Sequence, residues 1–505
     1  MRMIRAIAPP GDLAVLAGLA LARLAMHMLT NGQFGFHRDE LAVLDDARRL
    51  AWGYVAYPPL TPAVARMALE LFGPSLVGLR FFAALAQSAA MVVTGLMAYE
   101  LGGGRAAQVI AAAAAAIAPL ALVMGAMFQY IAFDYLWWVL GAYVMIRLLK
   151  SGDARWWVVM GAVIGVGLMT KYTMLIYAVG VGAAVMLTPA RRHLRSARLW
   201  AGMAVALVIC LPNLIRQAQH DWVGLAFTSS IRERDIALGR TEGFFSQQLF
   251  ANANPFTLPL WLAGLRYYFV AAAGRPYRVL GWMFVIPLAL FALLRGRFYY
   301  MAPGYPMLLA AGAVAAVGWL NGRARRWRRV LWTGQGAALA AGALMGGALM
   351  LPIAPVGSDW FKAAGEVHDN FAEQVGWPEL VGTVAAIYHT LPEEEQAVTG
   401  ILAGNYGEAG AINLYGPALG LPMAISGVNS YWGRGYGEPP SETVIVLGFG
   451  LEQAQALFRQ CTVAGQISNA YGVENEETRN SPLVFVCREI RTPWPEFWEG
   501  FQYFA

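Results

Sequence analysis

Charged side chains are scarce in this sequence of 505 residues. Asp, Glu, Lys and Arg make up 13% of the chain, whereas hydrophobic residues make up 58%. A soluble domain carries about 25% charged residues, so the composition excludes an ordinary soluble protein for most of the chain. Lysine is especially rare and occurs only at Lys150, Lys171 and Lys362, so arginine supplies nearly all of the positive charge.

Cysteine is also scarce and occurs only at Cys210, Cys461 and Cys487. No His/Cys spacing typical of a dedicated zinc site is present. Cys210 lies in an apolar run and is expected to be inert core. Two adjacent strands could bring Cys461 and Cys487 together, and whether they form a disulfide stays open.

The net charge of +6 does not indicate a nucleic-acid-binding protein. The arginines fall between apolar runs and form no basic patch with interleaved aromatic strands. Nucleic acid is therefore excluded as a partner.

Long apolar runs dominate the first two thirds of the chain. A membrane span needs about 20 apolar residues, and roughly eleven such runs occur. They lie near residues 12–30, 75–101, 105–124, 129–150, 155–171, 172–188, 199–216, 250–273, 278–295, 299–320 and 328–350. The first run is expected to be an uncleaved anchor, because its apolar core is long and no small-residue cleavage site follows. Residues 1–350 are thus predicted to form an all-α polytopic membrane domain.

The basic residues alternate along this domain, which predicts its topology. The inside segments hold Arg2, Arg5, Arg105, Arg147, Lys150, Arg155, Arg191, Arg192, Arg195, Arg198, Arg275, Arg278 and the RARRWRR run at 323–329. The outside then holds 31–74, the turns near 125–130, 171 and 295–300, the loop 217–249 and everything after about 351. The N-terminus is predicted to be cytoplasmic.

The first outer loop, 31–74, carries an amphipathic pattern. Val43, Ala47, Leu50 and Tyr54 share one helical stripe, as expected for a helix that lies along the membrane surface. Pro58 and Pro59 are expected to end this helix, and a second short helix at 62–72 leads back to the bilayer.

The tail, 351–505, has a different composition. Acidic residues return, and the apolar runs shorten to strand length at 397–404, 443–449 and 482–487. This predicts a small C-terminal α/β domain outside the membrane, long enough for its own core.

Ionisable residues at membrane depth or at its edge are the first candidates for chemistry. The carboxylates are Asp39 and Glu40, where the first run ends, and Asp134, near the outer end of the fourth run. The cations predicted on the same side are Lys171, Arg297, Arg295, Arg232 and Arg234. Carboxylates facing cations at one membrane surface suit an anionic, phosphate-bearing substrate.

Each of these residues also has a structural alternative. Asp39 could cap the surface helix, and Asp134 could pair with an arginine in a buried ion pair. Lys171 could extend to the interface, and Arg295 and Arg297 could be interfacial anchors. Their joint placement on one side favours a functional site.

The segment GNYGEAG at 404–410 follows a predicted strand and precedes a helix. It lacks the GxGxxG spacing of a nucleotide-binding loop, and no acidic residue follows in the right context. It is expected to form a tight turn or a surface that helps to admit an acceptor.

Several stretches together resemble a known family. They are FHRDEL at 36–41, WGYVAYPPL at 52–60, FD at 133–134, TKY at 170–172 and GRFYYMAPGYP at 296–306. The chain resembles GT-C glycosyltransferases over roughly residues 10–320. Within them it is most similar to the dolichyl-phosphate-mannose protein mannosyltransferases and the bacterial lipid A aminoarabinose transferases. It departs from many bacterial relatives at Ala56 and Tyr57, where an acidic residue and His are common.

The resemblance implies an inverting transferase that moves a sugar from a polyprenyl-phosphate-linked donor to an acceptor outside the membrane. Asp39 would be the general base, and Glu40 and Asp134 would position the base or the acceptor. Lys171 and Arg297 would stabilise the leaving phosphate, with Arg295, Arg232 and Arg234 as further donor-phosphate ligands. No cofactor is certain, and a divalent metal ion at Asp39 and Glu40 is an open alternative.

The acceptor could be a lipid, a glycan or a protein, and membrane lipids surround the chain. The Arg- and Ala-rich composition favours a bacterial plasma (inner) membrane, with the site and the C-terminal domain in the periplasm. The main alternative is a transporter or lipid flippase for a phosphate-bearing lipid, although no internal repeat typical of transporters occurs. A third is a membrane-anchored binding protein whose tail does the work.

Overall fold

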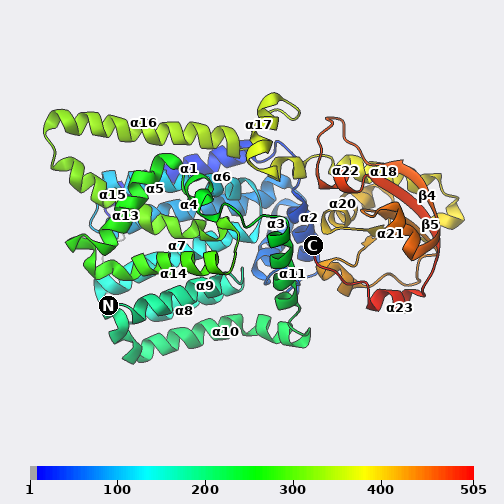
Figure 1. Ribbon diagram of the computed structural model, residues 1–505, viewed down its shortest axis with the longest axis horizontal. Coiled ribbons are helices and arrows are strands. Elements are labelled where there is room, and N and C mark those ends of the chain that lie inside the picture. The colour runs from blue at the N-terminus through cyan, green and yellow to red at the C-terminus, as the bar shows by residue number, and fades with distance from the viewer. Residues whose placement is uncertain (1–7) are drawn as a thin grey trace.

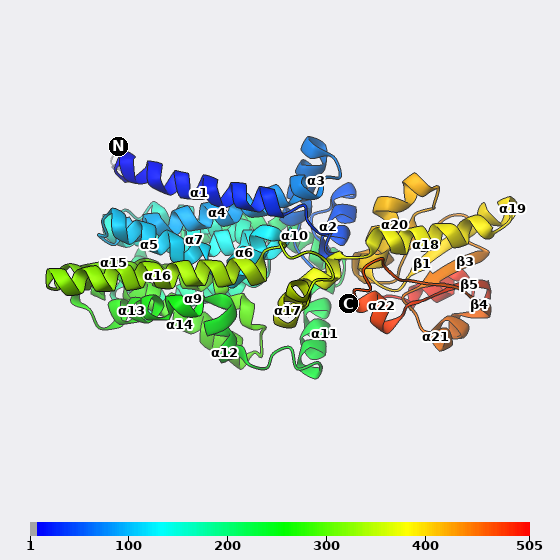
Figure 2. The ribbon, with the colours of Figure 1, turned by 90° about the horizontal axis from the view of Figure 1, so that it is seen from above.

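Two parts of different architecture lie end to end in the computed structural model, which describes residues 8–505. Long helices run side by side in a bundle, and a mixed α/β unit lies at one end of it (Figures 1 and 2). The predicted fold class, a helical membrane protein with a small C-terminal α/β domain, is therefore confirmed. Arg2 and Arg5, which the charge pattern assigns to the inside, lie outside the described residues.

The bundle helices follow the predicted apolar runs. They are α1 (Pro10–Thr30), α4 (Leu76–Glu100), α5 (Arg105–Ala116), α6 (Pro119–Ala126), α7 (Tyr130–Ser151), α8 (Trp156–Leu168), α9 (Met174–Met186), α10 (Ala197–Gln219), α13 (Leu258–Phe269), α14 (Arg278–Leu293), α15 (Tyr305–Asn321) and α16 (Arg325–Met350). Local sequence explains several ends: Pro119 begins α6, and Gly152 ends α7 in the left-handed conformation.

Six stretches are long and apolar enough to cross a membrane, or up to 8 if each of two bent pairs is one span. One bent pair is α5 with α6, and the other is α9 with the short 3₁₀ helix Pro189–Arg195. The predicted count of about eleven spans is not confirmed, because some helices fall well short of the ~20 residues that a span needs. Helices α8 and α13 are 13 and 12 residues long.

Glycine allows some of the bundle helices to touch backbone to backbone. At the crossing of α8 and α10, a Cβ atom on Gly161 would collide with the backbone of Gly202. A Cβ on Gly202 would in turn collide with the backbone of Trp157. Membrane helices use such small residues for close packing, since lipid offers them no hydrophobic driving force to associate.

Short helices gather at the end of the bundle next to the α/β unit (Figure 1). They are α2 (Arg38–Arg48), α3 (Leu60–Phe72), α11 (Val223–Ala237) and α17 (Asp359–Val367); α12 (Phe244–Gln247) follows α11. The start of α1 and the turn between α15 and α16 lie at the opposite end (Figure 2). The segments predicted to lie outside therefore share one end of the bundle, and the side of the membrane that this end faces stays a prediction.

Helix α2 is shorter than the predicted amphipathic helix and ends at Arg48, well before Pro58. The Tyr54 hydroxyl donates to the Asp46 carbonyl oxygen at 3.1 Å and folds the following chain into a compact turn. Leu44 is buried in a cluster that includes residues of the α/β unit. Helix α2 is thus enclosed between the bundle and that unit and does not lie free along the membrane surface.

The α/β unit is built on a mixed sheet of 5 strands in the order β2-β1-β3-β5-β4. The strands are β1 (Thr399–Ala403), β2 (Ala424–Ile425), β3 (Thr443–Leu447), β4 (Phe458–Gln466) and β5 (Leu483–Ile490). The helices are α18 (Trp377–Thr390), α19 (Glu393–Gln396), α20 (Tyr406–Tyr415), α21 (Leu451–Leu457), α22 (Glu476–Asn480) and α23 (Trp494–Glu499). Strands β1, β2 and β3 are parallel, and β5 is antiparallel to both of its neighbours.

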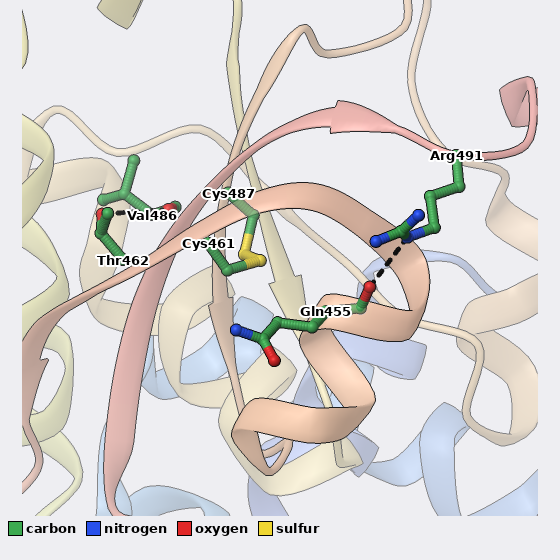
Figure 3. The surroundings of a disulfide bond; sticks show 6 residues. All are labelled: Gln455, Cys461, Thr462, Val486, Cys487 and Arg491. Carbon is green, nitrogen blue, oxygen red and sulfur yellow. Dashed lines mark hydrogen bonds between the residues drawn. A yellow bond between two sulfur atoms is a disulfide. The ribbon is translucent and has the colours of Figure 1, made fainter.

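Strands β1, β3 and β5 coincide with the three predicted strands. Every residue of β1 and β3 is buried. Strand β4 was not predicted, because it has no continuous apolar run. It lies at the edge of the sheet and is largely exposed. Cys461 of β4 lies opposite Cys487 of β5, and the two form a disulfide (Figure 3), which settles the pairing that the sequence left open.

Candidate functional site

The first turn of α2 places Asp39 and Glu40 in different surroundings. His37 is the N-cap residue: its Nδ1 accepts a hydrogen bond from the Asp39 backbone N–H at 3.2 Å. The Glu40 carboxylate accepts one from the His37 backbone N–H at 2.8 Å. This capping box fixes the helix start, so the helix is capped without the side chain of Asp39.

The Asp39 carboxylate is held from two sides and remains accessible. Its Oδ1 accepts a hydrogen bond from the Tyr406 hydroxyl at 2.9 Å, and its Oδ2 accepts one from the Gln129 amide. The side chain is 31% exposed. Asp39 is therefore an oriented carboxylate that solvent or a substrate can reach.

Glu40 is fully buried and fully engaged. Its Oε1 accepts from Arg80 Nε at 2.8 Å and from the Phe128 backbone N–H at 2.7 Å. Its Oε2 accepts from Arg80 Nη2 at 2.7 Å and from the His37 backbone N–H. A carboxylate has about four acceptor positions, and these four contacts occupy them. Glu40 thus ties the first outer loop to the bundle.

Lys171 lies in the turn between α8 and α9, among three tyrosine rings. Its ammonium is 5.0 Å from the ring centre of Tyr130, 5.4 Å from Tyr299 and 4.2 Å from Tyr300. Each ring face attracts a cation. The rings contact the ammonium without neutralising its charge, and the buried Asp134 carboxylate interacts with it electrostatically.

Asp134 is buried one turn into α7, near the same tyrosines. Its Oδ2 accepts a hydrogen bond from the Thr173 hydroxyl at 3.1 Å, and its Oδ1 has no hydrogen-bond partner within residues 8–505. In the part of the chain that the structure describes, Asp134 does not form the buried ion pair with an arginine that the sequence left open. Asp134 instead lies beside the turn that carries Lys171.

Arg297 forms a two-pronged ion pair with Asp235 of α11. Its Nε donates at 2.6 Å and its Nη2 at 2.5 Å. The guanidinium also lies 5.9 Å from the ring centre of Tyr299, which contacts Lys171 as well. The loop 217–249, which contains α11, is thereby joined to the turn that precedes α15.

The remaining predicted cations, Arg232, Arg234 and Arg295, have separate contacts. Arg232 donates through Nε to the Leu294 carbonyl oxygen at 2.9 Å. Arg234 has a buried Nε without a hydrogen-bond partner among the described residues. Arg295 is exposed, has a left-handed φ of 51° and lines a cavity of about 260 Å³ with Glu242. Within the described residues, none of these three arginines forms an ion pair with the Asp39 carboxylate.

Of the predicted residues, Asp39, Lys171 and Arg297 form one group, and Glu40 lies apart from it. Gln129, which contacts Asp39, directly precedes Tyr130, which contacts Lys171; Tyr299 then links Lys171 to Arg297. Glu40 faces Arg80 instead. Within residues 8–505, no cluster of three or more His, Cys, Asp or Glu side chains could hold a metal ion, so the donor set does not favour a metal at Asp39 and Glu40.

Sequence reasoning missed the partners of these residues. Arg80 is completely buried, and its position inside an apolar run could have marked it. Tyr299 and Tyr300 lie in one of the stretches that resemble the family, whereas Tyr130 lies outside them, and nothing local shows that the three meet. Tyr406 comes from the α/β unit, far along the chain.

An ionic contact also joins α2 to the α/β unit. Arg434 pairs with Asp45 and, at 2.5 Å, with Asp46. The Tyr57 hydroxyl donates to Asp46 Oδ2 at 2.7 Å. Burial raises the pKa of Asp46 to about 6, against the opposing effect of Arg434. Tyr57, which departs from many relatives, thus supports this contact.

Comparison with known proteins shows which families and folds the chain is similar to. Residues 56–215 match the family described as dolichyl-phosphate-mannose-protein mannosyltransferase. The structure of ArnT from Cupriavidus metallidurans bound to undecaprenyl phosphate superposes with a TM-score of 0.60 at 15% identity, covering 95% of this chain and 98% of that one. The chain therefore shares the overall fold of that ArnT structure. The predicted resemblance to the mannosyltransferase and ArnT group is confirmed.

Two further matches are the apo state of the same ArnT and a lipid A galacturonosyltransferase. The apo form of the same ArnT superposes with a TM-score of 0.57 at 16% identity, covering 94% of this chain and 98% of that one. The lipid A galacturonosyltransferase RgtD of Rhizobium johnstonii is 28% identical over 266 residues, which are 50% of this chain. That alignment spans 54% of RgtD, about half of its length. The region matched to the mannosyltransferase family contains Asp134 and Lys171, whereas Asp39 and Arg297 lie outside it.

Proposed function

We propose that this protein is a membrane glycosyltransferase. It takes a sugar from a polyprenyl-phosphate-linked donor and transfers it to an acceptor hydroxyl at the end of the bundle next to the α/β unit. The observation that carries the proposal is the grouping of one accessible carboxylate, Asp39, with two cations, Lys171 and Arg297. Gln129 contacts Asp39 and directly precedes Tyr130, which contacts Lys171, and Tyr299 lies near both cations.

The cations suit a phosphate leaving group. As the bond between the sugar and the phosphate breaks, the phosphate oxygen gains negative charge, and positive groups fixed nearby stabilise it. Lys171 offers an ammonium that the tyrosines hold in place. Asp235 occupies Nε and Nη2 of Arg297, which leaves Nη1 for a phosphate oxygen.

Asp39 suits the role of general base. The acceptor O–H bond breaks, its proton passes to an Asp39 oxygen, and the acceptor oxygen forms a bond to the anomeric carbon. The electron pair of the old carbon–oxygen bond leaves with the phosphate. One displacement of this kind inverts the anomeric centre. General-base catalysis requires hydrogen-bond reach to the proton, and the exposure of Asp39 permits it.

The other carboxylates have supporting roles in this proposal. Glu40 holds the first turn of α2 through Arg80 and so positions the neighbouring Asp39. Asp134 supports the turn of Lys171 through Thr173. The arginines near Arg297, which are Arg232, Arg234 and Arg295, supply positive charge where an anionic donor would approach.

The site is proposed to face the periplasm of a bacterial inner membrane, with the basic connections in the cytoplasm. A polyprenyl chain in the outer leaflet would then reach the site sideways from the bilayer. The ArnT structure that holds undecaprenyl phosphate and the lipid A activity in the name of RgtD support a polyprenyl donor and a glycolipid acceptor.

Sugar transfer from a panel of polyprenyl-phosphate sugars tests the proposal, with donors that carry uronic acid, aminopentose and neutral hexose. Purified wild-type protein is compared with Asp39→Asn and Lys171→Met. Asp153→Asn is the control, because that half-buried carboxylate lies in the connection after α7 and, within residues 8–505, forms its ion pair with Arg155 alone. Both site variants should lose turnover of the donor that the wild type uses, and the control should keep it.

Two results would overturn the proposal. One is full turnover by Asp39→Asn, because the base would then lie elsewhere. The other is a folded wild type that neither binds nor turns over any donor with lipid, glycan or peptide acceptors, which would favour a transporter or flippase.

A further inference from the structure

The segment 404–410, for which the proposed chemistry has no role so far, lies directly against the helix that carries Asp39. Helices α20 and α2 lie side by side at the junction of the two parts (Figures 1 and 2). A Cβ atom on Gly410 would lie 2.8 Å from backbone and side-chain atoms of Leu41. A Cβ on Gly407 would lie 2.9 Å from Arg38. The lack of a side chain at Gly407 and Gly410 therefore allows α20 to pack closely against α2.

The start of α20 is locally rigid. The Asn405 side chain accepts a hydrogen bond from the Glu408 backbone N–H at 2.9 Å. The Glu408 carboxylate accepts from the backbone N–H groups of Gly404 at 3.0 Å and Asn405 at 3.2 Å. This capping box sets the position of Tyr406, which directly follows Asn405.

From that position, the Tyr406 side chain extends from α20 to α2. Its hydroxyl donates to Asp39 Oδ1 at 2.9 Å, and the Arg38 guanidinium lies 4.9 Å from its ring centre. Desolvation raises the pKa of Tyr406, so the phenol keeps its proton and remains a donor at neutral pH. The contact is a hydrogen bond to a charged acceptor, the stronger kind.

We propose that Tyr406 is a positioning residue of the transfer reaction and that the active site is shared between the helical bundle and the α/β unit. The inference rests on the proposed function, in which Asp39 receives the acceptor proton. Tyr406 holds Oδ1 from the α/β unit while Gln129 holds Oδ2 from the bundle. Together they fix the plane of the carboxylate and direct its remaining lone pairs toward the acceptor.

Tyr406→Phe tests this role, because it removes only the hydroxyl. The value of kcat should fall about 10- to 100-fold, the order expected for a hydrogen bond to a charged group. The donor KM should stay unchanged, because the described contacts of Tyr406 do not include Lys171 or Arg297, the cations proposed to bind the donor phosphate. The acidic limb of the pH–rate profile should move to higher pH, because the Asp39 carboxylate loses a donor that favours its charged form.

The matched control is Tyr388→Phe in the same unit, whose hydroxyl donates to the Gln396 carbonyl oxygen at 3.0 Å. It should leave kcat and the pH profile at wild-type values. A second variant, Gly410→Ala, displaces α20 from α2 and should reproduce the fall in kcat and the pH shift. Gly382→Ala is its control, since a Cβ there meets nothing within 4 Å.

The outcomes separate this inference from the proposed function. If the wild type transfers sugar and both Tyr406→Phe and Gly410→Ala match its kcat and pH profile, the role of Tyr406 is refuted and the function stands. If the wild type transfers no sugar, both fall together, because Asp39 then has no proton transfer to serve. A fall in kcat without any shift of the acidic limb would also refute the role through Asp39.

Discussion

Replacing Glu40 with glutamine separates a structural role from a catalytic one. Glu40 and Arg80 are both completely buried and joined by two hydrogen bonds. The variant keeps the size of the side chain but removes its charge. Arg80 would then remain as an uncompensated cation. Its acceptors would be the single amide oxygen of the new glutamine, the carbonyl oxygens of Asn31 and Gly35, and the Gln374 amide oxygen.

The expected cost follows from this burial. Breaking a buried ion pair by removing one partner destabilises a protein by about 3 to 5 kcal/mol, because the other charge is left unpaired. Glutamine also presents an amide N–H₂ group where the carboxylate faced only N–H donors. The midpoint of thermal unfolding in detergent should therefore fall clearly for Glu40→Gln.

The assay pairs that unfolding measurement with turnover per folded molecule. Glu70→Gln is the control, because the Arg66–Glu70 pair on α3 is exposed and such pairs contribute little. The structure predicts lower stability for Glu40→Gln with turnover per folded molecule largely retained. Unchanged stability together with lost turnover would refute this reasoning and restore Glu40 as a catalytic group.

Three further predictions follow from other contacts. Tyr300→Leu should weaken donor binding by about 0.5 to 2 kcal/mol, because it removes the ring nearest Lys171; Tyr300→Phe should bind like the wild type in the same titration. Burial raises the pKa of Glu408 to about 8, above its ordinary value, so its contribution to stability is complete at acidic pH and is lost as pH rises through about 8. Unfolding midpoints measured from pH 5 to 9 should fall in the wild type and vary less in Glu408→Gln; parallel curves would contradict the assignment. Reduction of the Cys461–Cys487 disulfide, which closes a sequence separation of 26 residues, should destabilise the α/β unit by about 3 kcal/mol in denaturant titrations.

The helices and central strands were predictable because their signals are local. Each apolar run coincides with a helix, and β1, β3 and β5 coincide with short apolar runs because they lie inside the sheet. The end of α2 was not predictable from the proline pair, because the hydrogen bond from Tyr54 to Asp46 ends the helix earlier. The number of spans stays a prediction, because several apolar runs form helices shorter than the length that a span needs.

The candidate acids and cations were also visible in the sequence, but their partners were not. Asp39 and Glu40 are neighbours in the chain with the same chemistry, and no local pattern distinguishes them. Their difference arises from Arg80, which fills the acceptor positions of Glu40. The segment 404–410 was noticed for its glycines, whereas its contact with Asp39 depends on how two distant parts of the chain pack.

Composition and periodicity alone thus establish a polytopic helical protein with an α/β tail and a group of ionisable residues at one end, because hydrophobicity and charge act locally along the chain. The role of each residue is set by tertiary contacts, since hydrogen bonding and burial determine which carboxylate is free and which is engaged. Asp39 is accessible because its partners, Gln129 and Tyr406, leave part of the carboxylate exposed. Glu40 is enclosed because its partners cover it completely.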